Sequence, residues 1–590
     1  MWYLKQQVSL YILFSFTRKV CAVRGCTDFL IFFNEFIFGI SIISCIFAKI
    51  EILTMENKKF EFIPSFDNIE PKTLTENGAL SFSTTGSKLA DQFGKAGNHR
   101  GRNLYDVFAD QQALWEEDPL FALRFPFYLR MVTRKTKVNE NMTTVGVQKG
   151  QGVRDEAFKR MLYIAESHPD SFYKNLWMLP IVGSWKDVWQ LMYYDLNEGH
   201  SVLNREIIFQ LINEGLKSGT HADLIKKFMP RIKTNSKCTT DWTTITNMLA
   251  KEYAKYNGLS YREYNHLKTS GAAHDFQKLI CGGMYKDINW SLIPGRALSK
   301  ITTDKFLKKH ELTKNYVDWL TAQPTVKFTG YVHELFARYY KYKQRGKTIP
   351  LHEKITIDKQ FDELVKKATE DGHPLGNVWC ALDTSGSMWA DVAPNTTALD
   401  VCVSLGIFFS TLNQGAYHNN VVMFDSYSRT LRLDGTFCEK ADQIMNSGTA
   451  WGSTNFQSII DLMVRQRRKK PDIKIEDWPN SILVVSDMQF DNVGNQTNID
   501  LAKKKLYDVF PSEYVDNLKF IWWHVNSKKK DFPSEVGTGQ IFISGYDGSI
   551  ISLLLGAEVK AYEEKVGRPI TTEESIAIAL SQEILAYIEV

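Results

Sequence analysis

The stretch VWCALDTSGS at residues 378–387 decides the fold of the C-terminal part of this 590-residue chain. Its first five residues form an uninterrupted apolar run, which predicts a buried strand. Asp383, Ser385 and Ser387 follow in a turn that contains glycine, and Ala398 to Leu412 is a predicted helix that is apolar on nearly all sides. A buried strand, a polar turn and a buried helix are typical of the first unit of a doubly wound α/β sheet, whose ligand crevice lies at the carboxyl ends of the strands.

Two later segments repeat this pattern. SILVVSD at residues 481–487 is a second apolar run that ends in a carboxylate, Asp487, and the polar loop WGSTN, which contains Thr454, comes before a predicted helix from Phe456 to Arg468. Carboxylate and hydroxyl oxygens are the ligands that Mg²⁺ or Mn²⁺ prefers, so the sequence predicts a divalent-metal site. Further β-rich runs predict the rest of a mainly parallel sheet. They cover residues 420–425, 518–525 and 540–543.

The order D-x-S-x-S, then threonine, then a strand-terminal aspartate resembles the metal-ion-dependent adhesion site (MIDAS) of von Willebrand factor A domains. The resemblance implies that Asp383, Ser385 and Ser387 bind the metal directly or through water. It further implies that Thr454 is a ligand in one ligation state and that Asp487 usually lies outside the set of direct ligands. It also implies an open coordination position for an Asp or Glu of a protein partner. Two alternatives stay open, because Asp and Ser also cap helices and some A domains keep the motif without binding metal.

The region from about Asp106 to Lys347 is predicted to be helical. Its apolar residues recur at spacings of three and four, between short polar or Pro/Gly links. Paired helices of this kind indicate a solenoid or ring, although no strict repeat is readable. The predicted helices cover residues 156–167, 172–179, 185–194, 205–216, 242–256 and 304–320.

Four strings in the helical region resemble the domain of unknown function 2828 family. They are GQGVRD (150–155), LPIVGSWKD (179–187), FMPR (228–231) and NWSLIPGRA (289–297). That family joins such a helical region to a von Willebrand A-like domain, and the resemblance covers roughly residues 75–560. The layout is also similar to the Ro autoantigen (TROVE) proteins, in which a ring of helical repeats closed by an A domain binds RNA.

These patterns predict a multidomain protein. The fold class is an N-terminal all-α, HEAT-like repeat region joined to a C-terminal doubly wound, von Willebrand A-like domain. The predicted boundaries are 1–54 for a hydrophobic extension, 75–348 for the helical region, 375–560 for the A-like domain and 570–590 for a C-terminal helix.

The first 54 residues differ from the rest in being rich in Phe and Ile. Their uncharged stretch, Phe36 to Ala48, is short for a membrane span. We favour a dispensable extension or a true start at Met55, because charged residues interrupt the apolar segment. The alternative is a membrane anchor, in which case the membrane is a partner.

Composition excludes some classes of protein. A net charge of +4 and a pI near 8.3 are too mild to imply nucleic-acid binding by themselves. Eight cysteines include no C-x-x-C pair and no paired spacing with histidine, so we expect no structural zinc and favour a reducing, cytoplasmic location.

Two basic stretches mix cations with aromatic residues, the combination that contacts phosphates and stacks unpaired bases. The candidate RNA-binding residues are Lys226, Lys227, Arg231 and Lys233 in the first stretch and Arg338, Tyr339, Tyr340, Lys341, Tyr342, Lys343 and Arg345 in the second. The second is the better candidate. A solvated helix face whose tyrosines pack inward gives the same pattern.

Enzymatic chemistry finds little support. The chain has neither an H-E-x-x-H motif nor a G-x-S-x-G elbow, and Ser385 and Ser387 have no histidine nearby in sequence. We therefore expect a non-enzymatic protein whose A-like domain docks an acidic side chain of a protein partner through Mg²⁺ or Mn²⁺. The alternatives are an RNA-binding protein of Ro type that uses the helical ring, and a metal-dependent hydrolase.

Overall fold

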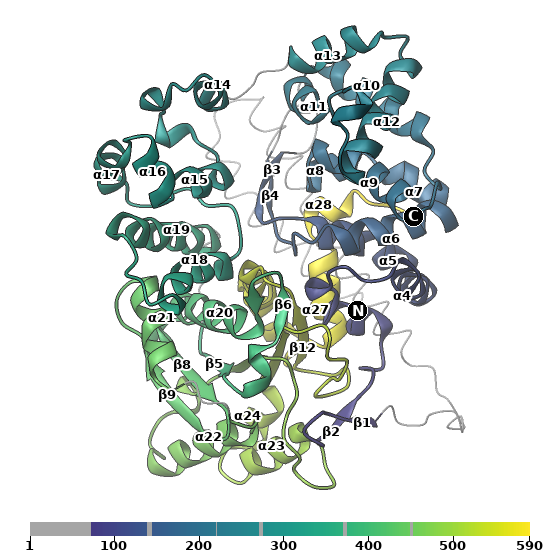
Figure 1. Cartoon of the computed structure of the whole chain (residues 1–590). Helices are drawn as coiled ribbons and strands as arrows, with labels where there is room; N and C mark the ends of the chain where they lie inside the picture. The colour runs from purple at the N-terminus through teal and green to yellow at the C-terminus, as the bar shows by residue number, and fades with distance from the viewer. Residues whose placement is uncertain (1–71, 138–143, 220, 271–274, 370–374, 449–451) are drawn as a thin grey trace, which may run out of the picture. The chain divides into compact units, whose positions relative to one another are not determined.

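The computed structural model of the chain describes residues 72–137, 144–219, 221–270, 275–369, 375–448 and 452–590 (Figure 1). The predicted extension or anchor, residues 1–54, lies outside the described residues. Within the described part, no helix is long and apolar enough to cross a membrane. The chain divides into two compact units, and the described residues all belong to the second, which begins at Phe66.

The C-terminal region is built on a six-stranded sheet with the order β12-β11-β10-β5-β8-β9. All neighbouring strands are parallel except β8 and β9, which form an antiparallel pair at one edge. The prediction of a mainly parallel sheet is confirmed, and β9 is the strand that it missed. The strands are β5 (Val378–Asp383), β8 (Asn420–Phe424), β9 (Ser428–Arg432), β10 (Ser481–Ser486), β11 (Lys519–His524) and β12 (Gln540–Ser544).

Helices cover both faces of this sheet, which is why its inner strands are continuous apolar runs. Helix α20 (Ala398–Leu412) packs on β5 and β10, and Gly406 is required there because a Cβ on it would lie 2.3 Å from Cδ1 of Leu382. Residues of α22 and α23 share a separate buried cluster with β10 and β11. The helices after α20 are α21 (Phe437–Asn446), α22 (Gln457–Lys469), α23 (Asn498–Tyr507), α24 (Ser512–Asn517), α25 (Ile551–Leu555), α26 (Ala557–Val566), α27 (Thr572–Leu580) and α28 (Glu583–Ala586).

The N-terminal region is helical, as predicted, with two short hairpins that the sequence did not predict. The hairpins are β1 (Lys72–Leu74) with β2 (Leu80–Phe82), and β3 (Arg134–Lys137) with β4 (Thr144–Gln148). The helices are α3 (Lys88–Phe93), α4 (Leu104–Glu117), α5 (Pro119–Arg130), α6 (Asp155–Ser167), α7 (Pro169–Asn175), α8 (Met178–Val182), α9 (Trp185–Asn197), α10 (Arg205–Ser218), α11 (Ala222–Phe228), α12 (Asp241–Tyr256), α13 (Tyr261–Thr269), α14 (Asp275–Cys281), α15 (Gly295–Ile301), α16 (Asp304–Lys309), α17 (Thr313–Ala322), α18 (Val332–Gln344) and α19 (Leu351–Thr369).

Three predicted helices are interrupted in the structure. The helix expected at 172–179 is divided between α7 and α8. The helix expected at 304–320 is split after α16, where Glu311 adopts a left-handed conformation (φ 57°) that no α-helix continues through. The C-terminal helix is split near Gln582, whose side chain instead hydrogen-bonds the backbone N–H and C=O of Lys149 at 2.8 and 2.9 Å.

The segment between α3 and α4 joins the helical region to the carboxyl ends of β11 and β12. Asn98 donates to the carbonyl of His524 at 2.5 Å and accepts from the Gly545 amide at 2.9 Å. Gln151 donates to the Ser544 carbonyl at 2.7 Å. These buried hydrogen bonds, together with the packing of α27 on both β12 and α5, connect the two regions.

Candidate functional site

The first candidate site is a pair of carboxylates at the switch point of the sheet. From β5 the chain continues to β8 on one side and later returns to β10 on the other, so the direction of winding reverses between β5 and β10. Asp383 ends β5 and Asp487 directly follows β10, its parallel neighbour. Ligand crevices form at such points, where diverging loops leave room beyond the strand ends.

Asp383 is fully buried, and each of its two carboxylate oxygens accepts a hydrogen bond. Its Oδ1 accepts from the Ser385 amide at 2.9 Å, and its Oδ2 accepts from the Ser486 hydroxyl at 2.5 Å. The hydroxyl oxygens of Ser385 and Ser387 lie 3.2 Å apart in the turn that follows. The Cys402 thiol of α20 donates a hydrogen bond to the backbone carbonyl of Asp383 at 3.4 Å, so this helix packs directly against the site.

Asp487 is also buried, and one of its oxygens is unsatisfied. Its Oδ1 accepts weakly from the Gln489 amide at 3.4 Å, and the nearby Ser387 hydroxyl opposes the rise that burial causes in the pKa of Asp487. Its Oδ2 has no hydrogen-bond partner among the described residues. Burial and the charge of Asp487 raise the pKa of Asp383 to about 7, and burial raises the pKa of Asp487. Two buried like charges with a free oxygen form a site that a cation would stabilise.

Thr454 lies on a loop that is tied to both aspartate loops. The Gly386 amide donates to the Gly452 carbonyl at 3.2 Å. The Thr454 amide donates to Oδ1 of Asp491 at 3.0 Å, and the Asp491 amide donates back to the Thr454 carbonyl at 3.0 Å. The structure thus brings Asp383, Ser385, Ser387 and Asp487 into one network and fastens the Thr454 loop beside them.

The chemistry of this network fits Mg²⁺ or Mn²⁺. Carboxylate and hydroxyl oxygens are hard ligands, and the orphan oxygen of Asp487 leaves part of the negative charge uncompensated. No group of three or more His, Cys, Asp or Glu side chains suited to a metal occurs in the described ranges. The site therefore depends on serine and threonine oxygens beside its two carboxylates, and metal binding stays a prediction.

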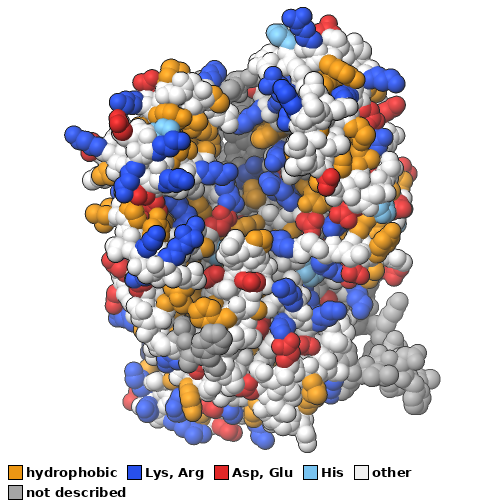
Figure 2. Space-filling view, viewed as in Figure 1, with side chains coloured by type: hydrophobic (Ala, Val, Ile, Leu, Met, Phe, Trp, Pro, Cys, Tyr) orange, Lys and Arg blue, Asp and Glu red, His pale blue; other side chains and the backbone are white. Residues whose placement is uncertain are grey.

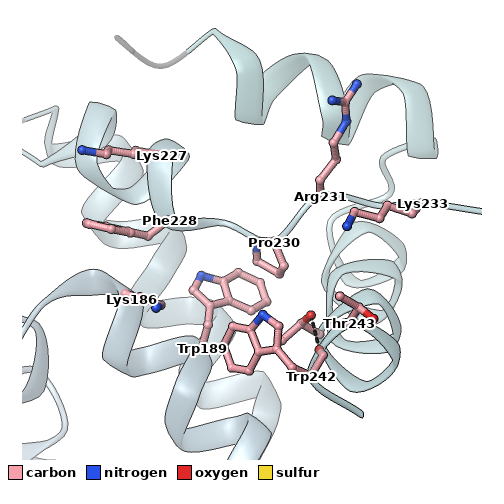
Figure 3. A pocket seen from close by; sticks show the side chains of 10 residues that line it. Lys186, Trp189, Lys227, Phe228, Pro230, Arg231, Lys233, Trp242 and Thr243 are labelled. Atoms are coloured by element: carbon pink, nitrogen blue, oxygen red, sulfur yellow. Dashed lines mark hydrogen bonds between the residues drawn. The ribbon is translucent and has the colours of Figure 1, made fainter. Parts of the chain in front are cut away.

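The second candidate site is a basic pocket between α9, α11 and α12 (Figure 3). Its cavity volume is about 300 Å³. Ten residues line it: Lys186, Trp189, Lys227, Phe228, Pro230, Arg231, Lys233, Trp242, Thr243 and Thr246. Three of the four residues predicted in the first basic stretch are among them, and Lys226 is not.

An extended segment after α11 carries two of the pocket's cations. The side chain of Asn265 in α13 forms two hydrogen bonds with the backbone of Ile232. It accepts from the N–H and donates to the C=O, both at 3.0 Å. Asn247 of α12 accepts from the Lys233 amide at 2.8 Å. Ile232 is buried while its neighbours Arg231 and Lys233 are exposed, because successive side chains of an extended segment point to opposite sides.

Two tryptophans supply the aromatic wall. Trp189 is only 2% exposed and packs edge-to-face on Tyr253, whereas Trp242 is half-buried against Tyr193, with ring centroids 4.8 Å apart. The Lys186 ammonium lies 5.8 Å from the Trp242 ring centroid. Trp242 thus presents part of its surface to the pocket from a fixed position.

The pocket cations form no salt bridge with a carboxylate of the described residues. Among the described residues, Lys186, Lys227, Arg231 and Lys233 form no ion pair within 4 Å. Burial lowers the pKa of Lys186 and of Lys227, and the charge of Arg154 lowers that of Lys186 further, although the charge of Asp187 favours the charged form of Lys186 and partly opposes this fall in its pKa. Figure 2 shows more Lys and Arg side chains gathered along the hollow between helices α9–α13 and helices α14–α19. An anion would find uncompensated positive charge here.

The second predicted basic stretch, on α18, is largely engaged in internal contacts. Arg338 donates to Gln360, the Tyr342 hydroxyl to Glu353, and both the Tyr339 hydroxyl and Lys343 to Asp442 of α21. Tyr340 stacks on Phe336. The other two candidate residues of this stretch, Lys341 and Arg345, are exposed. RNA binding by this stretch stays a prediction, and the contacts now favour the first stretch.

Sequence reasoning missed several residues of both sites. Lys186 and Trp189 are three apart in α9 and so share a helix face, a signal that was available in the string WKDVW. Trp242 lies on another helix, and no pattern connects it to them. At the carboxylate pair, Ser486 and Asp491 were missed because neither belongs to the D-x-S-x-S motif.

Comparison with known proteins places these sites in context. Residues 378–583 match a domain of unknown function, DUF7788. An uncharacterized protein, L728, of Acanthamoeba polyphaga mimivirus is 23% identical over 534 residues, which cover 82% of this chain and 85% of that protein. The crystal structure of the Deinococcus radiodurans RO (RSR) protein is similar with a TM-score of 0.43 and 13% identity, over 85% of this chain and 99% of that chain. The resemblance of the helical region to the domain of unknown function 2828 family stays a prediction.

Proposed function

We propose that this protein binds single-stranded RNA without catalysing a reaction, and that the pocket between α9, α11 and α12 holds one nucleotide. The observation that carries the proposal is the set of four cations around Trp189 and Trp242 that form no salt bridge with any described residue. A volume of about 300 Å³ is at the small end of ligand pockets and suits a single base with its phosphate.

Physical chemistry favours an unpaired strand. Phosphates bind to lysine and arginine, and an unstacked base gains about 1–3 kcal/mol by stacking on an aromatic ring. The bases of an RNA duplex are stacked on each other and cannot enter a pocket, whereas those of a single strand are free to turn outward. The order of the two regions, helical and then α/β, is also the layout in which the sequence resembles Ro autoantigen proteins.

Fluorescence anisotropy with a labelled single-stranded RNA tests this proposal. If three or four phosphates are neutralised, log K should fall with log salt concentration with a slope of about −2 to −3, since each contact on a single strand contributes about −0.7. Trp242→Ala should weaken binding about 10- to 100-fold, from the loss of one stacking contact, and leave the slope unchanged.

Tyr105→Ala is the control for this experiment, because Tyr105 is an aromatic residue on α4 that is 71% exposed and does not line the pocket. Its affinity should equal that of the unaltered protein. Binding that is insensitive to salt, or that Trp242→Ala leaves intact, would exclude the pocket as the site.

A second candidate function rests on the carboxylate pair. We also propose that Asp383, Ser385, Ser387, Thr454 and Asp487 hold Mg²⁺ or Mn²⁺, and that an acidic side chain of a protein partner completes its coordination. The buried Oδ2 of Asp487, which has no hydrogen-bond partner in the described part of the chain, supports this proposal. The bound ion would supply a positive centre at the crevice, where Ser387 and Gly452 are half-exposed at the rim.

Isothermal titration calorimetry with MgCl₂ and MnCl₂ tests the metal site. We expect saturable binding by the unaltered chain and none detectable for Asp383→Ala, which removes a carboxylate from the centre of the site. Asp434→Ala removes a carboxylate that is exposed on the surface and should bind normally. If the unaltered chain binds neither ion, the docking function is excluded and the RNA proposal is unaffected.

A further inference from the structure

The turn between β1 and β2 contacts the loop that begins directly after Asp487. Thr75 donates through its hydroxyl to the carbonyl of Phe490 at 2.8 Å, and the amide of Glu76 donates to Oε1 of Gln489 at 2.8 Å. Asn77 donates through its side-chain amide to the carbonyl of Gln489 at 2.6 Å. Three consecutive residues of the turn thus hold two consecutive residues of a loop more than 400 positions away in the sequence.

This loop needs such support. Met488, the residue next to Asp487, has a φ of 63°, a left-handed conformation that costs about 1–2 kcal/mol for a residue with a Cβ. Asp487 itself is buried close to the carboxylate of Asp383, which repels it. A strained backbone beside an unfavourable charge persists only where surrounding contacts hold it in place.

The same turn is also linked to the loop of Thr454, through the side chain of Asp491. Oδ1 of Asp491 accepts from the Thr454 amide at 3.0 Å and from the side-chain amide of Asn77 at 3.2 Å. Asn77 is therefore two hydrogen bonds away from Thr454, through Asp491, and two from Asp487, through Gln489. Among the described residues of the turn, Asn77 alone donates through its side chain to both Gln489 and Asp491.

We infer that the β1–β2 turn is a clamp for the metal site and that Asn77 is its principal positioning residue. The inference rests on the proposed metal-binding function. Asn77 touches no metal ligand itself. It fixes the relative position of the two loops that carry Thr454 and Asp487, so that their oxygens are in place before an ion arrives. Outer residues of this kind change metal affinity by about 10- to 100-fold when removed.

The test compares Mn²⁺ affinity by calorimetry for the full chain and for Asn77→Ala, with the melting temperature of each protein recorded without metal. We expect Asn77→Ala to weaken Mn²⁺ binding about tenfold or more. Ser81→Ala is the matched control: it also removes a hydrogen bond of this hairpin, from the Ser81 hydroxyl to the Phe532 carbonyl at 2.6 Å, but contacts neither loop of the site. Its Mn²⁺ affinity should stay within about twofold of the unaltered chain, because the ligands keep their supports.

The outcomes separate the clamp from the metal site. If Asn77→Ala binds Mn²⁺ as tightly as the unaltered chain, the clamp is overturned and the metal site stands. If Ser81→Ala weakens Mn²⁺ binding as much as Asn77→Ala does, the whole hairpin supports the site and Asn77 has no special role. Absence of Mn²⁺ binding in the unaltered chain would remove the metal site and the clamp with it. If Asn77→Ala does not fold, Thr75→Val decides the question, because it keeps the volume of Thr75 and removes only its hydrogen bond to Phe490 and the one from Ala79.

Discussion

Replacing Lys227, Arg231 and Lys233 together by glutamate is expected to lower the affinity for single-stranded RNA by about 10³-fold at low salt. One phosphate facing one cation gains between about 1 kcal/mol in water and about 4 kcal/mol near a protein surface. A loss of about 1.4 kcal/mol at each of three positions is a tenfold change in Kd for each. The salt slope should also fall toward zero, because the contacts that release counterions are gone.

A matched triple variant separates the pocket from bulk charge. Arg468, Lys469 and Lys470 are exposed at the end of α22, which lies at the opposite end of the described unit from α11 (Figure 1). Reversing these three residues changes the net charge by the same amount. If RNA affinity falls equally in both variants, nonspecific attraction explains the binding and the pocket has no special part in it.

The metal-free protein is expected to lose stability as the pH rises from about 4 to 7. Asp383 has a pKa of about 7 in the folded chain, raised from 3.8 by burial and by Asp487. Between these two values the folded state holds a proton that the unfolded state has lost, so each further rise in pH favours unfolding. At about 1.4 kcal/mol per pH unit, the loss amounts to about 4 kcal/mol at most and stops above the folded pKa.

Urea denaturation at pH 5 and at pH 7.5, in the presence of a chelator, measures this effect. Asp383→Asn keeps an acceptor for the Ser385 amide but carries no charge, so the part of the pH dependence due to Asp383 should disappear and the variant should be the more stable protein at pH 7.5. Excess Mg²⁺ should stabilise the unaltered chain at pH 7.5 and leave Asp383→Asn nearly unchanged. An identical pH profile for the two proteins would show that Asp383 is not held in the buried, repelled state described above.

Both predictions depend on residues that the sequence located to different degrees. The carboxylate pair was predictable because its residues end two strands that are buried on both faces, and such strands are continuous apolar runs. The oxygens of Asp383, Ser385 and Ser387 also lie within five residues of each other. The partner of Asp383 that is not in the motif, Ser486, differs from any other serine only by its place in the sheet.

The basic pocket was predictable only in part. Lys227, Arg231 and Lys233 are close in sequence and mark a basic stretch, but the same pattern occurs on α18, where the cations and tyrosines are used for contacts with α19 and α21. A basic stretch carries no information on which acidic residues lie nearby in the fold. The sequence therefore ranked the two stretches in the order opposite to the one that the contacts now favour.

By itself the sequence determined the two-part architecture, the bounds of α20, most strands of the sheet and the motif at the end of β5, since each depends on local periodicity and on burial that a short window records. Tertiary structure alone decided the break at Glu311, the antiparallel edge strand β9, the meeting of Trp242 with Lys186 and the contact of Asn77 with the loop after Asp487. Each of these depends on packing between segments far apart in the chain, and such packing leaves no periodic trace in the sequence of either segment.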